Sequence, residues 1–228
     1  MTTSPIRVAL ALILAVSAFP AAGFAGPGRS GPMILFSGQT LDFRGDLIQD
    51  LTLWHFEKAF FIPRLGKGLA LAVGLGGKGD GGSWDVSYLR STHTVSITGA
   101  PRTASFQAIE INGRSFFLKK SFLHPFFLGG ICLPFIRVDD GSAFRGGRSD
   151  ATYVGIGLNV GTGLLIEIGP SIVLNAGAVY RWIGFLYAFG EGKGRDINNL
   201  RTGFEGPEWG RLLRTNSLSL TIGLGFIL

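Results

Sequence analysis

The sequence has little charge and, after its first residues, no long apolar run. Only 16% of the 228 residues are charged, whereas 46% are hydrophobic and the mean hydropathy is +0.35. A surface built for water carries roughly a quarter to a third charged residues. A bundle of membrane helices needs apolar runs of about 20 residues, and none follows residue 25. The composition therefore excludes an ordinary soluble domain, a disordered chain and a helical membrane protein.

Cysteine and histidine are scarce as well. The single cysteine, Cys132, cannot form an internal disulfide, and we expect it to be a small apolar residue of a strand. No group of His, Cys, Asp and Glu has the spacing of metal ligands, so we predict neither a metal site nor a cofactor. The 21 basic and 15 acidic residues are scattered. Nucleic acid is therefore not an expected partner, whereas anionic lipid head groups are.

The start of the chain has the pattern of an export signal. Arg7 precedes a short apolar core, which is followed by small residues that end at Ala25. The apolar core is too short to span a membrane. We therefore expect residues 1–25 to be a signal peptide of the Sec pathway, residues 26–45 to be a lead-in, and residues 46–228 to form the folded domain.

The clearest pattern is a strict alternation at the end of the chain. From Leu218 to Leu228 every even position is large and apolar, and the odd positions are small or weakly polar. This is the period of a β-strand with two different faces. The segments 151–168 and 172–182 repeat it across a tight turn. Their second face is mostly Gly, Asn, Ser and Thr, which is too uncharged for a wet exterior. We therefore assign the aliphatic face to lipid and the small face to a lumen.

Alternating segments along the whole chain predict an all-β fold, an antiparallel transmembrane up-and-down β-barrel of eight strands. Ten strands would result if residues 33–44 added one and another segment split. Around them we expect a bulge or an extramembrane strand end near 91–93, a polar loop at 139–150 and a long outer loop at 190–214. The eight expected strands lie near residues 46–62, 67–76, 84–98, 104–118, 122–138, 151–168, 172–188 and 215–228.

Three polar residues are predicted to face the lumen, namely Glu167, Asn175 and Arg181. One interpretation is a buried pairing between strands, because an unpaired charge inside a narrow barrel is costly. The other is a polar constriction of a pore. Eight strands leave an interior that side chains just fill, so the first interpretation is favoured at that strand count.

The last eight residues resemble the C-terminal assembly signal of bacterial outer-membrane proteins. Thr221, Gly223, Phe226 and Leu228 occupy its polar, glycine, hydrophobic and terminal positions, with Leu where Phe is commoner. Together with the alternation, they make the chain similar to the superfamily of small OmpA-like and OmpW-like barrels. The resemblance implies a monomer in the outer membrane of a Gram-negative bacterium. Its implied partners are the barrel-assembly machinery, outer-membrane lipid and lipopolysaccharide.

We expect a structural, adhesion or ligand-binding role without catalysis, although some small outer-membrane barrels are lipid-modifying enzymes. One alternative is a lipid A-modifying acyl hydrolase, which needs a nucleophile, a base and an orienting group. His93, with Ser91 or Ser96, is the candidate pair, although the His-x-Ser-Asn signature of the lipid A deacylase family is absent. A narrow channel is the other alternative. We predict no catalytic residue.

Overall fold

The computed structural model places most of the chain. It describes residues 30–48, 51–55, 58–97, 100–118, 121–144, 147–169, 171–190, 193–196, 201–202 and 213–228. The expected signal peptide lies outside these residues.

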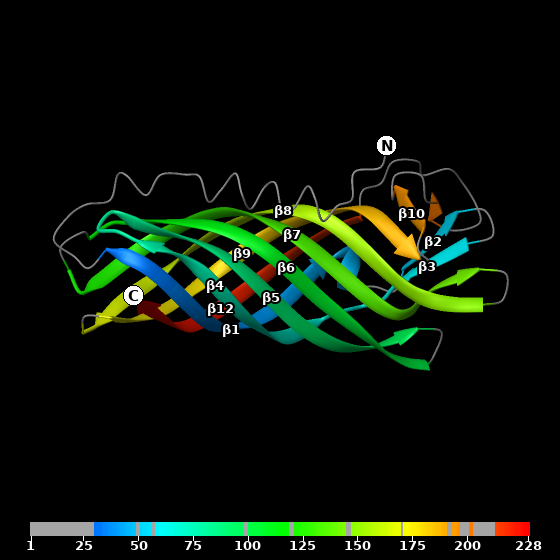
Figure 1. Cartoon of the computed structure of the whole chain (residues 1–228). Coiled ribbons are helices and arrows are strands. Elements are labelled where there is room, and N and C mark those ends of the chain that lie inside the picture. The colour runs from blue at the N-terminus through cyan, green and yellow to red at the C-terminus, as the bar shows by residue number, and fades with distance from the viewer. Residues whose placement is uncertain are drawn as a thin grey trace.

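Eight long strands close into one ring, in which each strand is antiparallel to both neighbours (Figure 1). In ring order they are β1 (Gly31–Gly45), β4 (Lys67–Lys78), β5 (Gly82–Ile97), β6 (Ala100–Phe116), β7 (Leu123–Phe144), β8 (Gly147–Ile168), β9 (Ile172–Gly190) and β12 (Leu213–Ile227). When the paired residues are followed once around the ring from Phe226, the path returns to β12 at Asn216, ten residues earlier in the chain. This stagger tilts the strands. The predicted eight-stranded barrel is confirmed.

The two ends of the barrel differ. One end has short connections, such as the turn in which the Gly79 N–H donates to the Gly82 carbonyl at 2.8 Å. The other end, to the right in Figure 1, holds the shorter elements. These are η1 (Asp46–Ile48), β2 (Leu51–His55), β3 (Lys58–Ile62), β10 (Lys193–Asp196) and β11 (Arg201–Thr202). We call the first the tight-turn end and the second the long-loop end. No helix of the described residues is long and apolar enough to cross a membrane.

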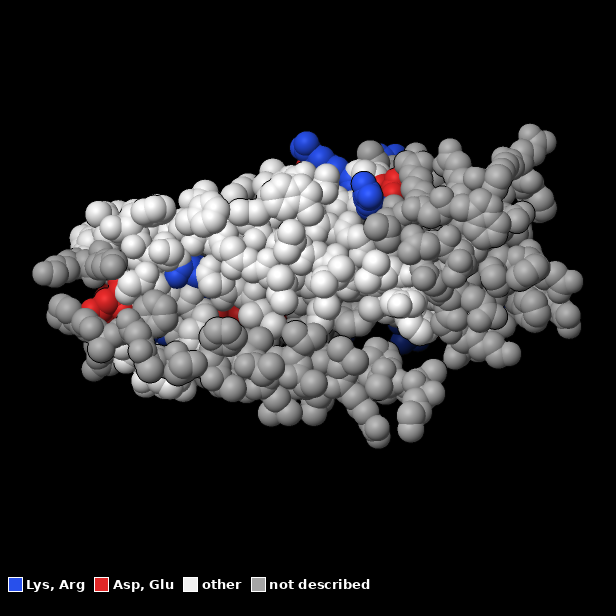
Figure 2. All heavy atoms as spheres, turned by 90° about the horizontal axis from the view of Figure 1, so that it is seen from above, with Lys and Arg blue, Asp and Glu red and all other residues white. Residues whose placement is uncertain are grey.

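The exterior of the barrel is apolar. On β12, Leu220 and Ile222 are 61% and 67% exposed, whereas Ser217 and Ser219 are fully buried. The predicted alternation of faces is therefore confirmed. Figure 2 shows one face of the barrel, with few charged atoms between the two ends. Large apolar residues are exposed on every ring strand except β6; examples are Phe36, Leu71, Tyr88, Phe127, Leu158, Trp182 and Leu220.

The interior is layered, and β6 passes through every layer. Its inward residues are apolar at the long-loop end, as at Phe106, then polar from Glu110 to Arg114, and apolar again at Phe116. The apolar residues belong to two separate clusters, one toward each end. Cys132 is buried in the cluster at the long-loop end, as a small apolar residue of a strand. Side chains thus fill the lumen along its length.

The expected N-terminal boundary is wrong. The barrel begins with β1 at Gly31, so the segment 26–45 is not merely a lead-in, and 46–62 is not a ring strand. The outward face of β1 carries Gly38 and polar residues, which hides its alternation. Residues 46–62 instead form η1 and the β2–β3 hairpin, whose Phe60 packs into the apolar cluster at the long-loop end.

The expected bulge at residues 91–93 is also wrong. β5 pairs with β6 in one unbroken register from Gly82 to Ile97. The inward residues of β5 change from polar, as at Asp85, to apolar, as at Val95. The apolar residues thus change parity in the sequence because the interior changes from polar to apolar, while the pairing of β5 with β6 continues without a break.

The expected polar loop at 139–150 is largely strand. β7 runs to Phe144 and β8 starts at Gly147, with a register shift between Val138 and Ser142. Asp140 lies at this bulge with a φ of 53°, a conformation that Asp tolerates better than most residues. The expected loop 190–214 contains β10 and β11, and most of its other residues lie outside the described ones.

The assignment of the outer face to lipid is tested by placing an arginine on that face at two depths, one midway along the barrel and one near its long-loop end. Leu220→Arg lies midway along β12 on the outer face, and we expect it to lower the free energy of unfolding by about 2–4 kcal/mol. Thr94→Arg, on the same face of β5 near the long-loop end, is the control and should cost about 1 kcal/mol or less. Urea unfolding in lipid vesicles measures both. Equal effects would contradict the assignment.

Candidate functional site in the barrel interior

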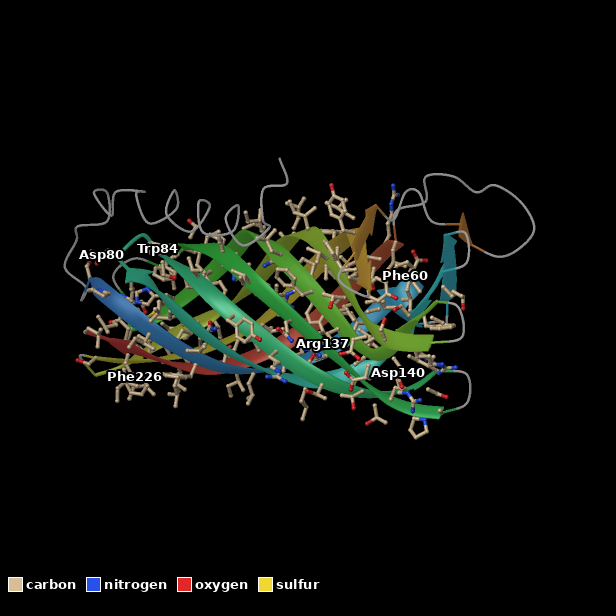
Figure 3. All side chains as sticks on the ribbon, turned by 45° about the vertical axis from the view of Figure 1, so that its right-hand side comes forward. Phe60, Asp80, Trp84, Arg137, Asp140 and Phe226 are labelled. Carbon is tan, nitrogen blue, oxygen red and sulfur yellow. The ribbon has the colours of Figure 1, made fainter. Side chains whose placement is uncertain are left out.

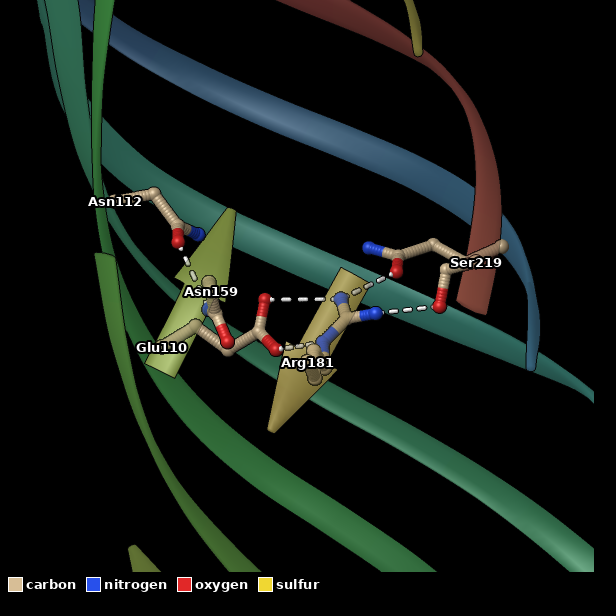
Figure 4. Close-up of polar contacts among 6 residues, drawn as sticks. Glu110, Asn112, Asn159, Arg181 and Ser219 are labelled. Carbon is tan, nitrogen blue, oxygen red and sulfur yellow. Dashed lines mark hydrogen bonds and ion pairs between the residues drawn. The ribbon is translucent and has the colours of Figure 1, made fainter. Parts of the chain in front are cut away.

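The polar layer of the interior is centred on Arg181. Its guanidinium is fully buried and contacts three side chains, one from each of three other strands (Figure 4). Nε donates to Glu110 Oε1 at 2.6 Å, and Nη2 donates to Glu110 Oε2 at 3.2 Å and to Gln39 Oε1 at 2.8 Å. Nη1 donates to the Ser219 hydroxyl. A bidentate pair of this kind is both strong and directional, so it ties β9 to β6 across the lumen.

Two further polar pairs extend this layer toward the tight-turn end. Arg114 on β6 forms an ion pair with Asp85 on β5, and both side chains are almost fully buried. The Asn159 amide donates to Asn112 Oδ1 at 3.0 Å. The period of two in β6 places Glu110, Asn112 and Arg114 on the same inward face, which is why one strand supplies a member of every pair.

The polar layer encloses a cavity of about 30 Å³, lined by Asn175, Arg181 and Thr221 among others. The Oδ1 of Asn175 and the Oγ1 of Thr221 are buried there and have no hydrogen-bond partner among the described residues. A water molecule needs roughly 10–15 Å³ of such volume and two to four polar partners. The cavity therefore has room for about two waters, and is far too small for a solute.

The predicted polar residues are only partly brought together. Asn175 and Arg181 line the same cavity, as expected for the lumen. Glu167 lies apart at the tight-turn end of β8, where Lys78 Nζ and His124 Nε2 contact its carboxylate at 2.6 Å and 2.9 Å. His124 Nδ1 also lies 2.7 Å from the Leu118 carbonyl. A carboxylate and a backbone carbonyl are thus the two polar partners of the His124 ring.

The sequence interpretation missed the acids and bases that pair inside the barrel. Arg181 pairs with Glu110 and not with Glu167, and the Asp85–Arg114 pair was not anticipated. One signal for them exists. Glu110, Asn112 and Arg114 share the parity of Phe106, and a polar run at alternate positions indicates a common face. The mixed apolar pattern on the other parity of that segment obscured it.

Ser91 and His93 form a hydrogen bond inside the barrel. The Ser91 hydroxyl lies 2.9 Å from His93 Nε2, and both residues are buried. The His93 ring packs edge-on against Phe43, with centroids 5.8 Å apart. Ser96, the other candidate nucleophile, is exposed on the opposite face of β5. Among the described residues no three His, Cys, Asp or Glu side chains gather as a metal site would need.

The residues of the terminal motif lie at the seam between β12 and β1. A Cβ on Gly223 would come within 2.5 Å of the Phe36 carbonyl oxygen, so this position needs glycine. Phe226 points outward and packs edge-on against Phe36, with ring centroids 6.4 Å apart. Thr221 is half-buried, and Leu228 is exposed at the end of the chain.

The charged residues at the long-loop end of β6, β7 and β8 form ion pairs. Arg102 contacts Asp140 at 2.8 Å, and Arg137 donates to Asp150 at 2.6 Å. Figure 3 shows Arg137 and Asp140 at the opposite end of the barrel from Trp84 and Phe226. The hydrogen bond from Arg137 lowers the pKa of Asp150 below its ordinary value. Both side chains are exposed, so solvent weakens this pair.

This architecture, a closed antiparallel ring of eight strands with an apolar exterior and a filled polar interior, is that of small outer-membrane β-barrels. No protein-family model and no curated protein matches the chain. Neisserial surface protein A (NspA) has a similar fold, with a TM-score of 0.56 and 17% identity over 88% of this chain and 99% of that chain. At such an identity the likeness concerns the fold alone.

Two other solved structures are similar at lower scores. The outer-membrane protein OprG from Pseudomonas aeruginosa has a TM-score of 0.43 and 12% identity, covering 88% of this chain and 97% of that chain. Ail, the attachment invasion locus protein of Yersinia pestis, was solved with the heparin analogue sucrose octasulfate. It has a TM-score of 0.43 and 11% identity, covering 89% of this chain and 100% of that chain.

The buried ion pair is tested by removing one partner and then both. Arg181→Met leaves the Glu110 carboxylate buried without its partner, and we expect a loss of about 3–5 kcal/mol in the free energy of unfolding. The double variant Arg181→Met, Glu110→Leu removes both charges and should lie closer to the wild type than either single variant. Urea unfolding in vesicles measures the cycle. Strictly additive losses would show that the two residues do not act as a pair.

Proposed function

We propose that this protein is an integral outer-membrane β-barrel with a structural, adhesion or ligand-binding role and no catalysis. The observation that carries the proposal is the apolar exterior, because a barrel in water must turn a charged face outward. In lipid only a closed barrel or a helix satisfies its backbone groups. The terminal motif and the fold shared with NspA support the same location. The proposal includes export through the Sec pathway. It also includes a monomeric state, with lipid and lipopolysaccharide around the barrel.

The filled interior favours this role over that of a channel. The Arg181–Glu110 ion pair crosses the lumen, the Arg114–Asp85 pair lies inside it between neighbouring strands, and an apolar cluster lies on each side of them. The cavity between them, about 30 Å³, has no room for a hydrated solute. Any adhesion or binding role then belongs to surfaces outside the lumen.

The proposal is tested by migration on a gel and by fractionation. Folded outer-membrane barrels resist detergent, so the unheated protein should migrate differently from the boiled protein. Expressed with its leader in a Gram-negative host, the protein should also sediment with the outer membrane. A soluble protein whose migration does not change on heating would refute the proposal.

A lipid A-modifying hydrolase is the second candidate, and the hydrogen bond between Ser91 and His93 favours it. Against it, both residues face the interior, away from the surface on which a lipid would lie. The His93 ring also has a hydrogen bond with the backbone of Leu65, a partner that cannot replace the acid of a catalytic triad. We therefore place the pair in the packing of the apolar cluster.

The two candidates differ in what they do to lipid A. After incubation of the refolded protein with lipopolysaccharide, we expect the mass of lipid A to be unchanged. Mass spectrometry of the extracted lipid measures this. Loss of an acyl chain that disappears in both Ser91→Ala and His93→Ala, with the barrel still folded, would establish the hydrolase instead.

A further inference from the structure

A groove crosses the outer face of β12, β1 and β4 where Gly38 lacks a side chain. Gly38 on β1 lies directly between Leu71 on β4 and Ile222 on β12. A Cβ placed on Gly38 would meet no atom within 4 Å. The groove is open and has a volume of about 670 Å³. Its side-chain walls are Phe36, Leu71, Val73, Tyr88, Arg90, Leu174, Ile222 and Leu224.

Four basic residues point outward on neighbouring strands at one end of this groove. They are Arg214 on β12, Arg44 on β1, Lys67 on β4 and Arg90 on β5, and all are exposed. Each shares the outward parity of its strand, and each lies nearer the long-loop end than the groove residues of that strand. Register pairs Lys67 with Asp42, and Arg90 with Leu71 of the groove. We call this set the basic rim.

The basic rim has more basic than acidic side chains and is therefore positively charged. Two described acids lie close to it: Asp42, which is 3.9 Å from Arg44, and the buried Asp46, whose carboxylate accepts a hydrogen bond from the backbone N–H of Arg214 at 2.8 Å. Lys67, Arg90 and Arg214 have no ion-pair partner among the described residues. By contrast, Arg102 and Arg137 on the β6–β8 side are both paired with aspartates. The two sides of the barrel thus differ in their attraction for an anion.

The position of the rim fits the level of lipid head groups. A cation on the lipid face is costly at the membrane centre and is tolerated near the interface, where a long side chain reaches polar surroundings. The apolar groove begins directly below Arg90, which lines it. An arginine recognises a phosphate through paired hydrogen bonds. Because lipid tails are already in an apolar medium, charge at the rim decides which lipid is retained.

We propose that the face of β12, β1, β4 and β5 binds one phosphorylated, multiply acylated lipid of the outer leaflet. Lys67 and Arg90 contact its phosphate, and one acyl chain lies in the groove at Gly38. This inference rests on the proposed function, since it needs the barrel to be embedded in the membrane with its long-loop end outward.

The head-group contact is tested by native mass spectrometry of the refolded barrel with an equimolar mixture of diphosphorylated lipid A and phosphatidylethanolamine. The wild type should retain lipid A in preference. Lys67→Gln with Arg90→Gln should reduce that retention about tenfold, as expected when charged hydrogen bonds are lost. The matched control is Arg102→Gln with Arg137→Gln on the other side, which should leave retention unchanged.

The groove is tested separately by filling it. Gly38→Leu has space for its side chain and should reduce lipid A retention while the barrel stays folded. Gly129→Leu on β7 is the matched control, because Gly129 is also exposed with no atom within 4 Å of its Cβ. It should bind as the wild type does.

Heat-modifiable migration of every variant distinguishes a failure of the lipid site from a failure of the proposed barrel. If the wild type is not heat-modifiable, the proposed function fails. If all variants are heat-modifiable but the rim and groove variants retain lipid A like their controls, the lipid site is wrong and the barrel stands. Equal retention of phosphatidylethanolamine and lipid A by the wild type would also overturn the site.

Discussion

The closure of β12 onto β1 is the constraint on which the rest of the structure depends. Lipid offers no hydrogen bonds to a backbone, so an open sheet edge inside a membrane leaves a row of unsatisfied groups. β12 and β1 come from opposite ends of the described chain and pair from Met33 to Gly45. Gly223 allows the close approach to β1 at this seam, and Phe226 packs against Phe36 across it. The terminal motif is therefore part of the closure itself.

Closure with eight strands leaves a narrow interior, and its content follows from that width. Side chains must fill it, and any charge inside must find a partner there because desolvation is costly. Arg181 with Glu110, Arg114 with Asp85, and Lys78 with Glu167 meet that requirement at successive levels. The same pairs that stabilise the barrel occlude its lumen, which moves any binding role to the loops and the outer face.

Much of this fold could be predicted from sequence wherever two faces differ in both size and polarity. The terminal strand and the β8–β9 hairpin alternate large aliphatic residues with glycine and small polar residues, so their faces could be assigned directly. β1 was predicted only as an optional extra strand at residues 33–44, because Gly38 and polar residues interrupt its outward apolar face. The partner of Arg181 could not be found either. Glu110 is 71 residues away along the chain, and only ring order and register bring the two strands to the same level.

The position that hid β1 also shapes the outer surface. A large apolar residue at position 38 would have extended the outward apolar face of β1 and would have filled the space between Leu71 and Ile222. Glycine weakens a strand interior, and no neighbouring atom requires it there. This contrasts with Gly223, where a close backbone approach explains the glycine. An open groove below unpaired cations is a reason for glycine at position 38 that barrel assembly alone does not supply.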